Sequence, residues 1–286
     1  MNRKKYLILS AILTFSGALL LTSCLKKGDV HKEQTREKES STEKASGKSE
    51  SAAEATETTA ITEEEKTEEI PEITAEDILE YDAGTIVTED ELACVEPSEL
   101  FTAAEIEDTV FERMKGISFG DDCTTKREDL RYLRILHTGF DGETHIGEIV
   151  CHRDIAEDLL DIFRKLYEEN YPIEKVRLVD EYGGDDELSM ADNNSSCFNF
   201  RNVAQTTHLS EHAYGRAIDI NPLYNPYITS SGYTPLNAGE YVDRSRDFPY
   251  KIDEKDLCCR LFTEHGFTWG GDWNTVKDYQ HFEKGR

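Results

Sequence analysis

The stretch SEHAYGRAID, residues 210–219, decides how this chain folds around its most informative side chains. Its second half alternates like a β-strand, so Asp219 shares a face with the small Ala217 and lies opposite Ile218. An unpaired carboxylate is costly to bury in that position, and a bound cation would offset the cost. Gly215 has no side chain, so the backbone there can approach a metal or a substrate closely.

A second informative stretch, DYQHFE at residues 278–283, lies near the end of the chain. Catalytic zinc takes three protein ligands and leaves a fourth position open. The residues His212, Asp219 and His281 supply such a set. Asp278 precedes His281 by three residues and is placed to take a proton from water, while Glu283 shares a strand face with His281 and is expected to orient its imidazole.

Each of these residues also has an ordinary explanation when it is taken singly. His212 is also explained as an ordinary surface histidine. Asp219 is also explained as a cap of the turn before Pro222. Asp278 and Glu283 are equally accounted for by the general acidity of the chain, which has 59 Asp and Glu against 32 Lys and Arg. The two stretches together favour the zinc site.

The pattern S-E-H-x-x-G-x-A-x-D followed by D-x-x-H-F-E resembles the zinc D-alanyl-D-alanine carboxypeptidases of the lysostaphin/D-Ala-D-Ala/hedgehog superfamily. The closest similarity is to the branch with phage endolysin L-alanyl-D-glutamate peptidases. That similarity runs from about Ile117 to the end of the chain. It includes the segments FNFR (198–201), NPLYNPY (221–227) and GFTWGGDW (266–273).

This resemblance implies that His212, Asp219 and His281 bind Zn²⁺ and that Asp278 is the catalytic base. It also implies that Arg201 stabilises the oxyanion or a substrate carboxylate, which suits the fixed donors of a guanidinium. Relatives more often carry a small residue or cysteine where Phe200 stands, which puts details of the pocket in doubt. The residues expected to line the substrate cleft are Ser210, Tyr214 and Trp273, although packing in the core or rim explains the aromatic ones equally well.

The hydrophobic periodicity predicts an α+β fold in which helices flank a small antiparallel sheet and the zinc site lies in a cleft. Strands are predicted at 130–137, 145–150, 176–179, 216–220 and 279–283. Helices are predicted at 102–114, 153–170 and 254–265. The domain organisation expected from this pattern is a helical lead-in over 91–116 and a zinc peptidase domain over 117–286.

Residues 1–24 have the pattern of a secretory signal, with three basic residues before a 16-residue apolar segment. The segment ends in LTSC, which resembles a bacterial lipobox, so Cys24 is predicted to be lipidated; the alternative is an uncleaved signal anchor. Residues 25–90 are predicted to be a disordered acidic tether, because they are rich in Glu, Thr and Ser and poor in apolar residues. We therefore expect the protein at the extracellular face of the bacterial membrane, held by a lipid anchor.

The composition limits the partners of the protein. A formal net charge of −27 disfavours nucleic acid as a ligand, because phosphate backbones require clustered cations. Seven cysteines leave six beside Cys24, and their disulfide pairing cannot be assigned from the sequence. The substrate implied by the resemblance is a peptidoglycan peptide, and the protein is expected to be a monomer.

Three functions are compatible with these patterns. The first is a zinc peptidase of peptidoglycan stem peptides, acting as a D-alanyl-D-alanine carboxypeptidase or an L-alanyl-D-glutamate endopeptidase. The second is a non-hydrolytic, zinc-containing wall-binding module, since hedgehog domains of the same superfamily act by binding. The third is a solute-binding lipoprotein, but about 170 folded residues are few for the two lobes that it requires.

Overall fold

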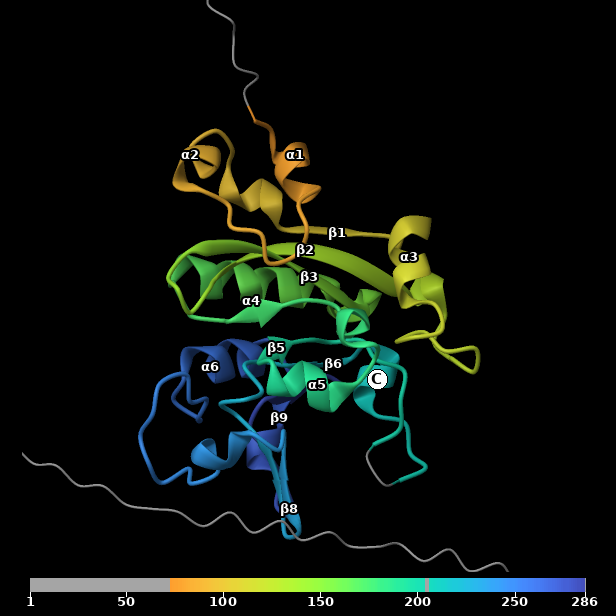
Figure 1. Ribbon diagram of the computed structural model, residues 1–286, viewed down its shortest axis with the longest axis vertical. Coiled ribbons are helices and arrows are strands. Elements are labelled where there is room, and N and C mark those ends of the chain that lie inside the picture. The colour runs from red at the N-terminus through yellow and green to blue at the C-terminus, as the bar shows by residue number, and fades with distance from the viewer. Residues whose placement is uncertain (1–72, 204–205, 286) are drawn as a thin grey trace, which may run out of the picture. The chain divides into compact units, whose positions relative to one another are not determined.

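Figure 1 shows the computed structural model, which describes residues 73–203 and 206–285. All described residues belong to one compact unit, Lys66–Arg286. The predicted signal segment, Cys24 and positions 25–72 of the predicted tether lie outside the described residues. No helix in the described part has the length and apolar character needed to cross a membrane.

The first layer is a three-stranded antiparallel sheet in the order β1-β2-β3. The strands are β1 (Thr102–Ala104), β2 (Leu130–Thr138) and β3 (Thr144–His152). The long hairpin of β2 and β3 pairs residues from Leu130↔His152 to Thr138↔Thr144, which confirms the two strands predicted there. Helix α4 (Ala156–Glu168) packs against β2 through one apolar face, as the periodicity predicts.

The second layer holds three short sheets. The strands β6 (Ala217–Asp219), β11 (His281–Glu283) and β9 (Thr268–Trp269) form one antiparallel sheet in the order β6-β11-β9. Another has the order β10-β7-β8, from β10 (Lys277–Asp278), β7 (Tyr227–Thr229) and β8 (Gly232–Thr234). The strands β4 (Lys175–Val176) and β5 (Asn194–Ser195) form a parallel pair. These mixed helices and small sheets are consistent with the predicted α+β class.

The remaining helices are short and lie mostly at the edges of the sheets. The α-helices are α1 (Ala75–Leu79), α2 (Glu89–Leu92), α3 (Asp108–Met114), α5 (Asp186–Ala191) and α6 (Leu257–Glu264). The 3₁₀ turns are η1 (Pro97–Leu100), η2 (Arg127–Asp129), η3 (Arg153–Ile155), η4 (Val179–Tyr182), η5 (Glu211–Tyr214), η6 (Ala238–Tyr241) and η7 (Gly270–Asp272).

One hydrophobic core joins the two layers. It contains Phe163 of α4, Phe262 of α6 and Phe282 of β11, all fully buried, and Phe262 stacks on Phe282 with ring centroids 4.3 Å apart. Because Phe282 follows His281 directly, this packing fixes the strand that carries one of the candidate zinc ligands. The hydrophobic core therefore fixes the position of the site, although the site residues themselves are polar.

The predicted tether differs from the structure over 73–90. Helix α1 begins with a capping box between Thr74 and Asp77, and Ile78 of this helix is fully buried in the main core. Val87 joins the same core with 2% of its surface exposed. These two apolar side chains are widely spaced in an acidic background, so composition alone hides them.

Most predicted elements differ from the observed ones at their boundaries, and in three of them the difference concerns the pairing of strands. The predicted helix over 102–114 is divided, because Thr102–Ala104 extends the sheet along β2 and the helix begins only at Asp108. The predicted strand over 176–179 is shorter, because Val179 begins the turn η4. The predicted strand over 279–283 begins at His281, two residues late. In each case, pairing with a neighbouring strand decides the limits of the element.

Replacing Ile78 tests whether 73–90 belongs to the folded unit. Ile78→Ala is expected to lower the free energy of unfolding by about 2–5 kcal/mol, because it removes a fully buried side chain and leaves a cavity. Glu80→Ala, at the exposed end of α1, is the control and is expected to change stability by less than about 0.5 kcal/mol. Urea unfolding measures both; equal stability of the two variants would contradict the packing of α1.

Candidate metal centre

His212 is presented by the turn η5. The Ser210 hydroxyl accepts a hydrogen bond from the backbone N–H of His212 at 3.3 Å, which caps the start of the turn. The Nδ1 atom of His212 lies 2.6 Å from the carbonyl oxygen of Cys197. Since a carbonyl only accepts, Nδ1 carries the proton, and the Nε2 lone pair is left for a ligand.

Asp219 and His281 are brought together by strand pairing. In the antiparallel pair of β6 and β11, Asp219 lies directly opposite His281. The Nδ1 atom of His281 lies 3.0 Å from Oδ1 of Asp219, and its Nε2 atom lies 3.2 Å from Oε2 of Glu283. Glu283 therefore occupies the far side of the imidazole, where the sequence places it, and leaves Nδ1 facing the aspartate.

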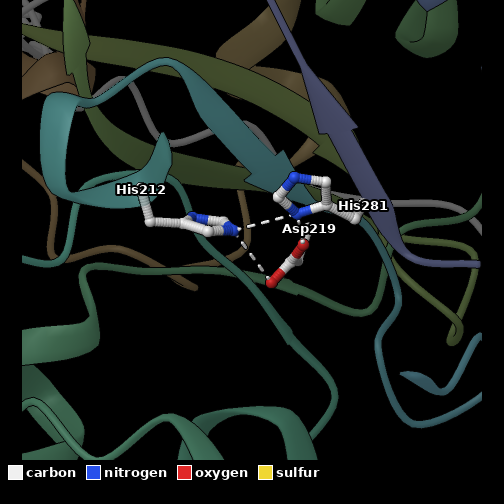
Figure 2. Close-up of side chains that lie close together, drawn as sticks. All are labelled: His212, Asp219 and His281. Carbon is white, nitrogen blue, oxygen red and sulfur yellow. Dashed lines mark hydrogen bonds and ion pairs between the residues drawn. The ribbon is translucent and has the colours of Figure 1, made fainter. Parts of the chain in front are cut away.

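Figure 2 shows the side chains of His212, Asp219 and His281 converging on one point. Nε2 of His212 lies 3.3 Å from Oδ2 of Asp219 and 3.2 Å from Nδ1 of His281. One ligand atom from each residue lies within 4.8 Å of the others, and all three residues are buried. The structure thus assembles the three ligands that the sequence predicts.

Burial makes this group electrostatically demanding. Burial by itself raises the pKa of Asp219, but His212 and His281 outweigh it and hold that pKa well below its usual range. Burial by itself lowers the pKa of His281, but its hydrogen bonds to Asp219 and Glu283 raise it to about 10. A buried carboxylate thus requires a positive partner, which is a proton on His281 or a bound cation.

The donor set fits Zn²⁺. It comprises two imidazole nitrogens and one carboxylate oxygen, which are ligands that zinc prefers in catalytic sites. The two imidazole nitrogens face each other at 3.2 Å, and two lone pairs at that distance repel unless a proton or a cation lies between them. Glu283 bonds to Nε2 of His281, and the Cys197 carbonyl bonds to Nδ1 of His212. In each histidine, the nitrogen that faces away from the group is thus hydrogen-bonded, as it is in zinc-binding histidines.

Asp278 lies beside this group with one carboxylate oxygen, Oδ1, that has no hydrogen-bond partner. It is the last residue of β10 and pairs with Tyr227 of β7. Its Oδ1 atom is buried without a hydrogen-bond partner. Burial raises the pKa of Asp278 to about 7; the charge of Asp219 adds to this rise, and His281 opposes it. A carboxyl group of this pKa can exchange protons near neutral pH.

Two adjacent glycines allow this approach. A Cβ atom on Gly270 would lie 2.6 Å from the carbonyl oxygen and 2.8 Å from the Cβ atom of Asp278. A Cβ atom on Gly271 would lie 2.3 Å from the ring of Trp269. The GFTWGGDW segment therefore needs both glycines, since larger residues would displace Asp278 or the indole of Trp269.

Arg201 is held by an acidic partner. It forms an ion pair with Asp186, the first residue of α5, and the same carboxylate accepts a hydrogen bond from Nδ2 of Asn199 at 2.8 Å. The backbone of Asn199 donates to the carbonyl of His212 at 3.1 Å, and the carbonyl of Arg201 accepts from the N–H of Ser210 at 3.1 Å. The chain of Arg201 thus lies beside the turn of His212, while its guanidinium is paired with Asp186.

The three predicted cleft residues lie in different settings. Ser210 is buried and caps η5, so its observed contact is structural. Tyr214 is half-buried at the end of the same turn. The ring centroid of Trp273 lies 5.3 Å from that of His281, which places it at the metal centre. Contact of any of them with substrate stays a prediction.

Several hydrogen-bond and ion-pair partners in this site cannot be identified from the sequence. The carbonyl of Cys197 has no side-chain signal at all, and Asp186 is one acidic residue among many. Gly270 and Gly271 do carry a signal, because adjacent glycines before an Asp-Trp pair suggest close backbone packing.

Residues 204–284 match a family model described as D-alanyl-D-alanine carboxypeptidase. The match covers less than a third of the chain, but it contains His212, Asp219, His281 and Asp278. Arg201 lies just outside it. No curated protein and no solved structure matches the chain. The match supports the family that the sequence patterns suggest, and it indicates a hydrolytic peptidase.

Zinc binding can be measured without any substrate. The protein is expected to bind about one Zn²⁺ through the three ligands, and His212→Ala or Asp219→Ala to abolish that binding. Glu283→Gln is expected to weaken it about 10–100-fold, because the imidazole loses its acceptor. Metal analysis and calorimetry check this, with exposed His208→Ala as the control. Equal zinc content in the His212→Ala variant would contradict the site.

Gly270→Ala tests the close approach of the backbone to Asp278. The added methyl group is expected to displace the carboxylate and lower kcat at least about tenfold, while the zinc content stays unchanged. Gly285→Ala is the matched control, because a Cβ atom there meets nothing within 4 Å. Steady-state kinetics on wall peptides measure the effect. Full activity of the Gly270→Ala variant would contradict the prediction that activity requires this close approach of the backbone to Asp278.

Proposed function

We propose that this chain is a zinc-dependent peptidase that hydrolyses the peptide stems of peptidoglycan. The observation that carries the proposal is the convergence of His212, Asp219 and His281 beside Asp278, whose Oδ1 atom has no hydrogen-bond partner. The match to a D-alanyl-D-alanine carboxypeptidase model over 204–284 supports the same reaction class. Zinc held by those three residues would polarise the scissile carbonyl and lower the pKa of water.

The residues of the chain have distinct tasks in this proposal. Asp278 accepts a proton from the attacking water and passes it to the leaving amine, for which its carboxylate beside the metal group is placed. Glu283 and the Cys197 carbonyl hold the two imidazoles in the required orientation. Trp273 packs beside His281, with ring centroids 5.3 Å apart, and helps to hold the imidazole in place.

Arg201 serves in this proposal as the donor to the oxygen that gains negative charge. Its guanidinium is paired with Asp186, so it reaches a substrate oxygen by sharing or exchanging this partner. Asp186 also accepts a hydrogen bond from the side chain of Asn199, and the backbone N–H of Asn199 donates to the carbonyl of His212. The pair of Asp186 and Arg201 therefore connects the charge-stabilising group to the turn that presents a zinc ligand.

The bond that is cleaved depends on the branch of the family to which the chain belongs. We infer cleavage of either the terminal D-alanyl-D-alanine bond or the L-alanyl-D-glutamate bond. We further propose that lipidation at Cys24 holds the enzyme, as a monomer, at the outer face of the membrane, where the wall is its substrate. Mass spectrometry of muropeptide products distinguishes the two bonds, since the first loses one alanine and the second releases the stem.

Asp278→Asn tests the proposed base. Hydrolysis is expected to fall at least about 100-fold, because the amide accepts no proton, while zinc content is retained. Exposed Asp247→Asn, which makes the same change elsewhere, is expected to keep full activity. Equal hydrolysis by wild type and the Asp278→Asn variant would contradict Asp278 as the base, and absence of hydrolysis by wild type would favour a non-hydrolytic wall-binding module.

The pH dependence follows from the ionisation of Asp278. Only the ionised form accepts a proton, so kcat/KM is expected to fall as the pH drops through its pKa. Without metal, burial raises that pKa to about 7, and a bound cation stabilises the carboxylate and lowers it. The acid limb is therefore expected below about pH 7 in wild type. A profile flat down to pH 4 would contradict the assignment.

A further inference from the structure

A cavity of about 630 Å³ adjoins the candidate metal centre. Two of its lining residues touch His281. Glu283 bonds to the imidazole Nε2 at 3.2 Å, and the ring centroid of Trp273 lies 5.3 Å from that of His281. The volume falls in the range of ligand pockets, which hold roughly 300–1,000 Å³. The cavity therefore lies next to His281, on the side of the imidazole where Glu283 bonds to Nε2.

The lining combines aromatic rings with neutral hydrogen-bonding groups. Its aromatic members are Phe267, Trp269 and Trp273, its hydroxyl and amide members are Thr263, Thr268, Asn274 and Thr275, and its carboxylates are Asp272 and Glu283. No Lys, Arg or His lines it. Two carboxylates without a cation repel an anionic ligand, so the cavity is suited to a neutral or cationic one.

One wall offers an aromatic platform with polar neighbours on both sides. Trp269 is buried, and its Nε1 atom donates to the carbonyl of Tyr279 at 2.9 Å. Trp273 is half-buried and lies between the exposed Asp272 and Asn274. Neither the Asp272 nor the Asn274 side chain forms a hydrogen bond or ion pair with a described residue, so both are available to a ligand.

A sugar ring matches this arrangement better than an ammonium group. The C–H face of a pyranose packs on an indole, and its hydroxyl groups bond to carboxylate, amide and hydroxyl groups at the rim. An ammonium group would need both carboxylates, but Glu283 is already engaged with His281. Only Asp272 remains for it. The hydroxyls of Thr263 and Thr268 already donate to backbone carbonyls. Asn274 and Thr275, by contrast, form no side-chain hydrogen bond with a described residue and favour a polyhydroxylated ligand.

We propose that this cavity binds a saccharide ring of the glycan strand while the metal centre holds the attached peptide. This inference rests on the proposed peptidase function and specifies its substrate as glycan-linked peptide. The sugar lies against Trp273, with Asp272 and Asn274 as its hydrogen-bonding partners. The enzyme then prefers stems that are still attached to the wall.

Sugar binding can be tested separately from hydrolysis. Trp269 and Trp273 are the only two tryptophans of the chain, so intrinsic fluorescence reports on this cavity. Titration of the full chain with triacetylchitotriose, in the presence of a chelator, is expected to give a saturable change. The double variant Asp272→Ala/Asn274→Ala is expected to bind at least about tenfold more weakly, and exposed Asp247→Ala to bind like wild type.

Two results of this titration would overturn the inference. One is the absence of a saturable change with the sugar, or equal affinity of wild type and the double variant. The other is saturable binding of a lysine-containing peptide without binding of the sugar, which would make the cavity an ammonium site.

A second measurement compares one stem peptide in free form and joined to its disaccharide. Wild type is expected to hydrolyse the linked form with a kcat/KM at least about tenfold higher, and the double variant to lose most of this preference. Equal hydrolysis of both forms by wild type would overturn the saccharide site and leave the peptidase standing. Sugar binding without hydrolysis of either form would support the saccharide site and overturn the proposed peptidase.

Discussion

The pairing of β6 with β11 is the constraint on which the site depends. It places Asp219 opposite His281 across two antiparallel strands, and it is fixed by the packing of Phe282 in the core. Because side chains alternate along a strand, a register shift of one residue between β6 and β11 would put Asp219 and His281 on opposite faces of the sheet. The hydrophobic core thus sets the polar geometry, although no apolar residue takes part in binding.

The same arrangement concentrates charge that the fold cannot satisfy by itself. Asp219 is buried between two imidazoles, and Asp278 is close enough for their charges to affect one another's pKa. Such a group is stable with a cation at its centre, and without one it must retain a proton on His281. Metal affinity and stability are therefore coupled in this protein, and the cost of assembling the ligands is met by the surrounding core.

The neighbourhood of His281 joins three features that are separate in the sequence. Glu283 bonds to its imidazole, Trp273 packs beside it, and both continue into the cavity beyond. On the opposite side, the carbonyl of Cys197 fixes His212, and the Asp186–Arg201 pair lies near that turn. The charged pair of Asp186 and Arg201 thus lies near the turn of His212, and the aromatic Trp273 lies beside His281.

The sequence by itself determined the residues of the site and the main elements around it. The spacing of His212, Asp219, Asp278 and His281 matches the pattern expected of a zinc peptidase. Helix α4 has a strong periodicity because it buries one apolar face, and β2 and β3 are long runs in which most side chains are buried. Only the tertiary structure decided the contacts that have no local signal: the Cys197 carbonyl behind His212, the pairing of Arg201 with Asp186, and the burial of Ile78. These depend on segments distant in the chain meeting in space, and a backbone carbonyl or one apolar residue in an acidic segment leaves no pattern from which such a meeting can be read.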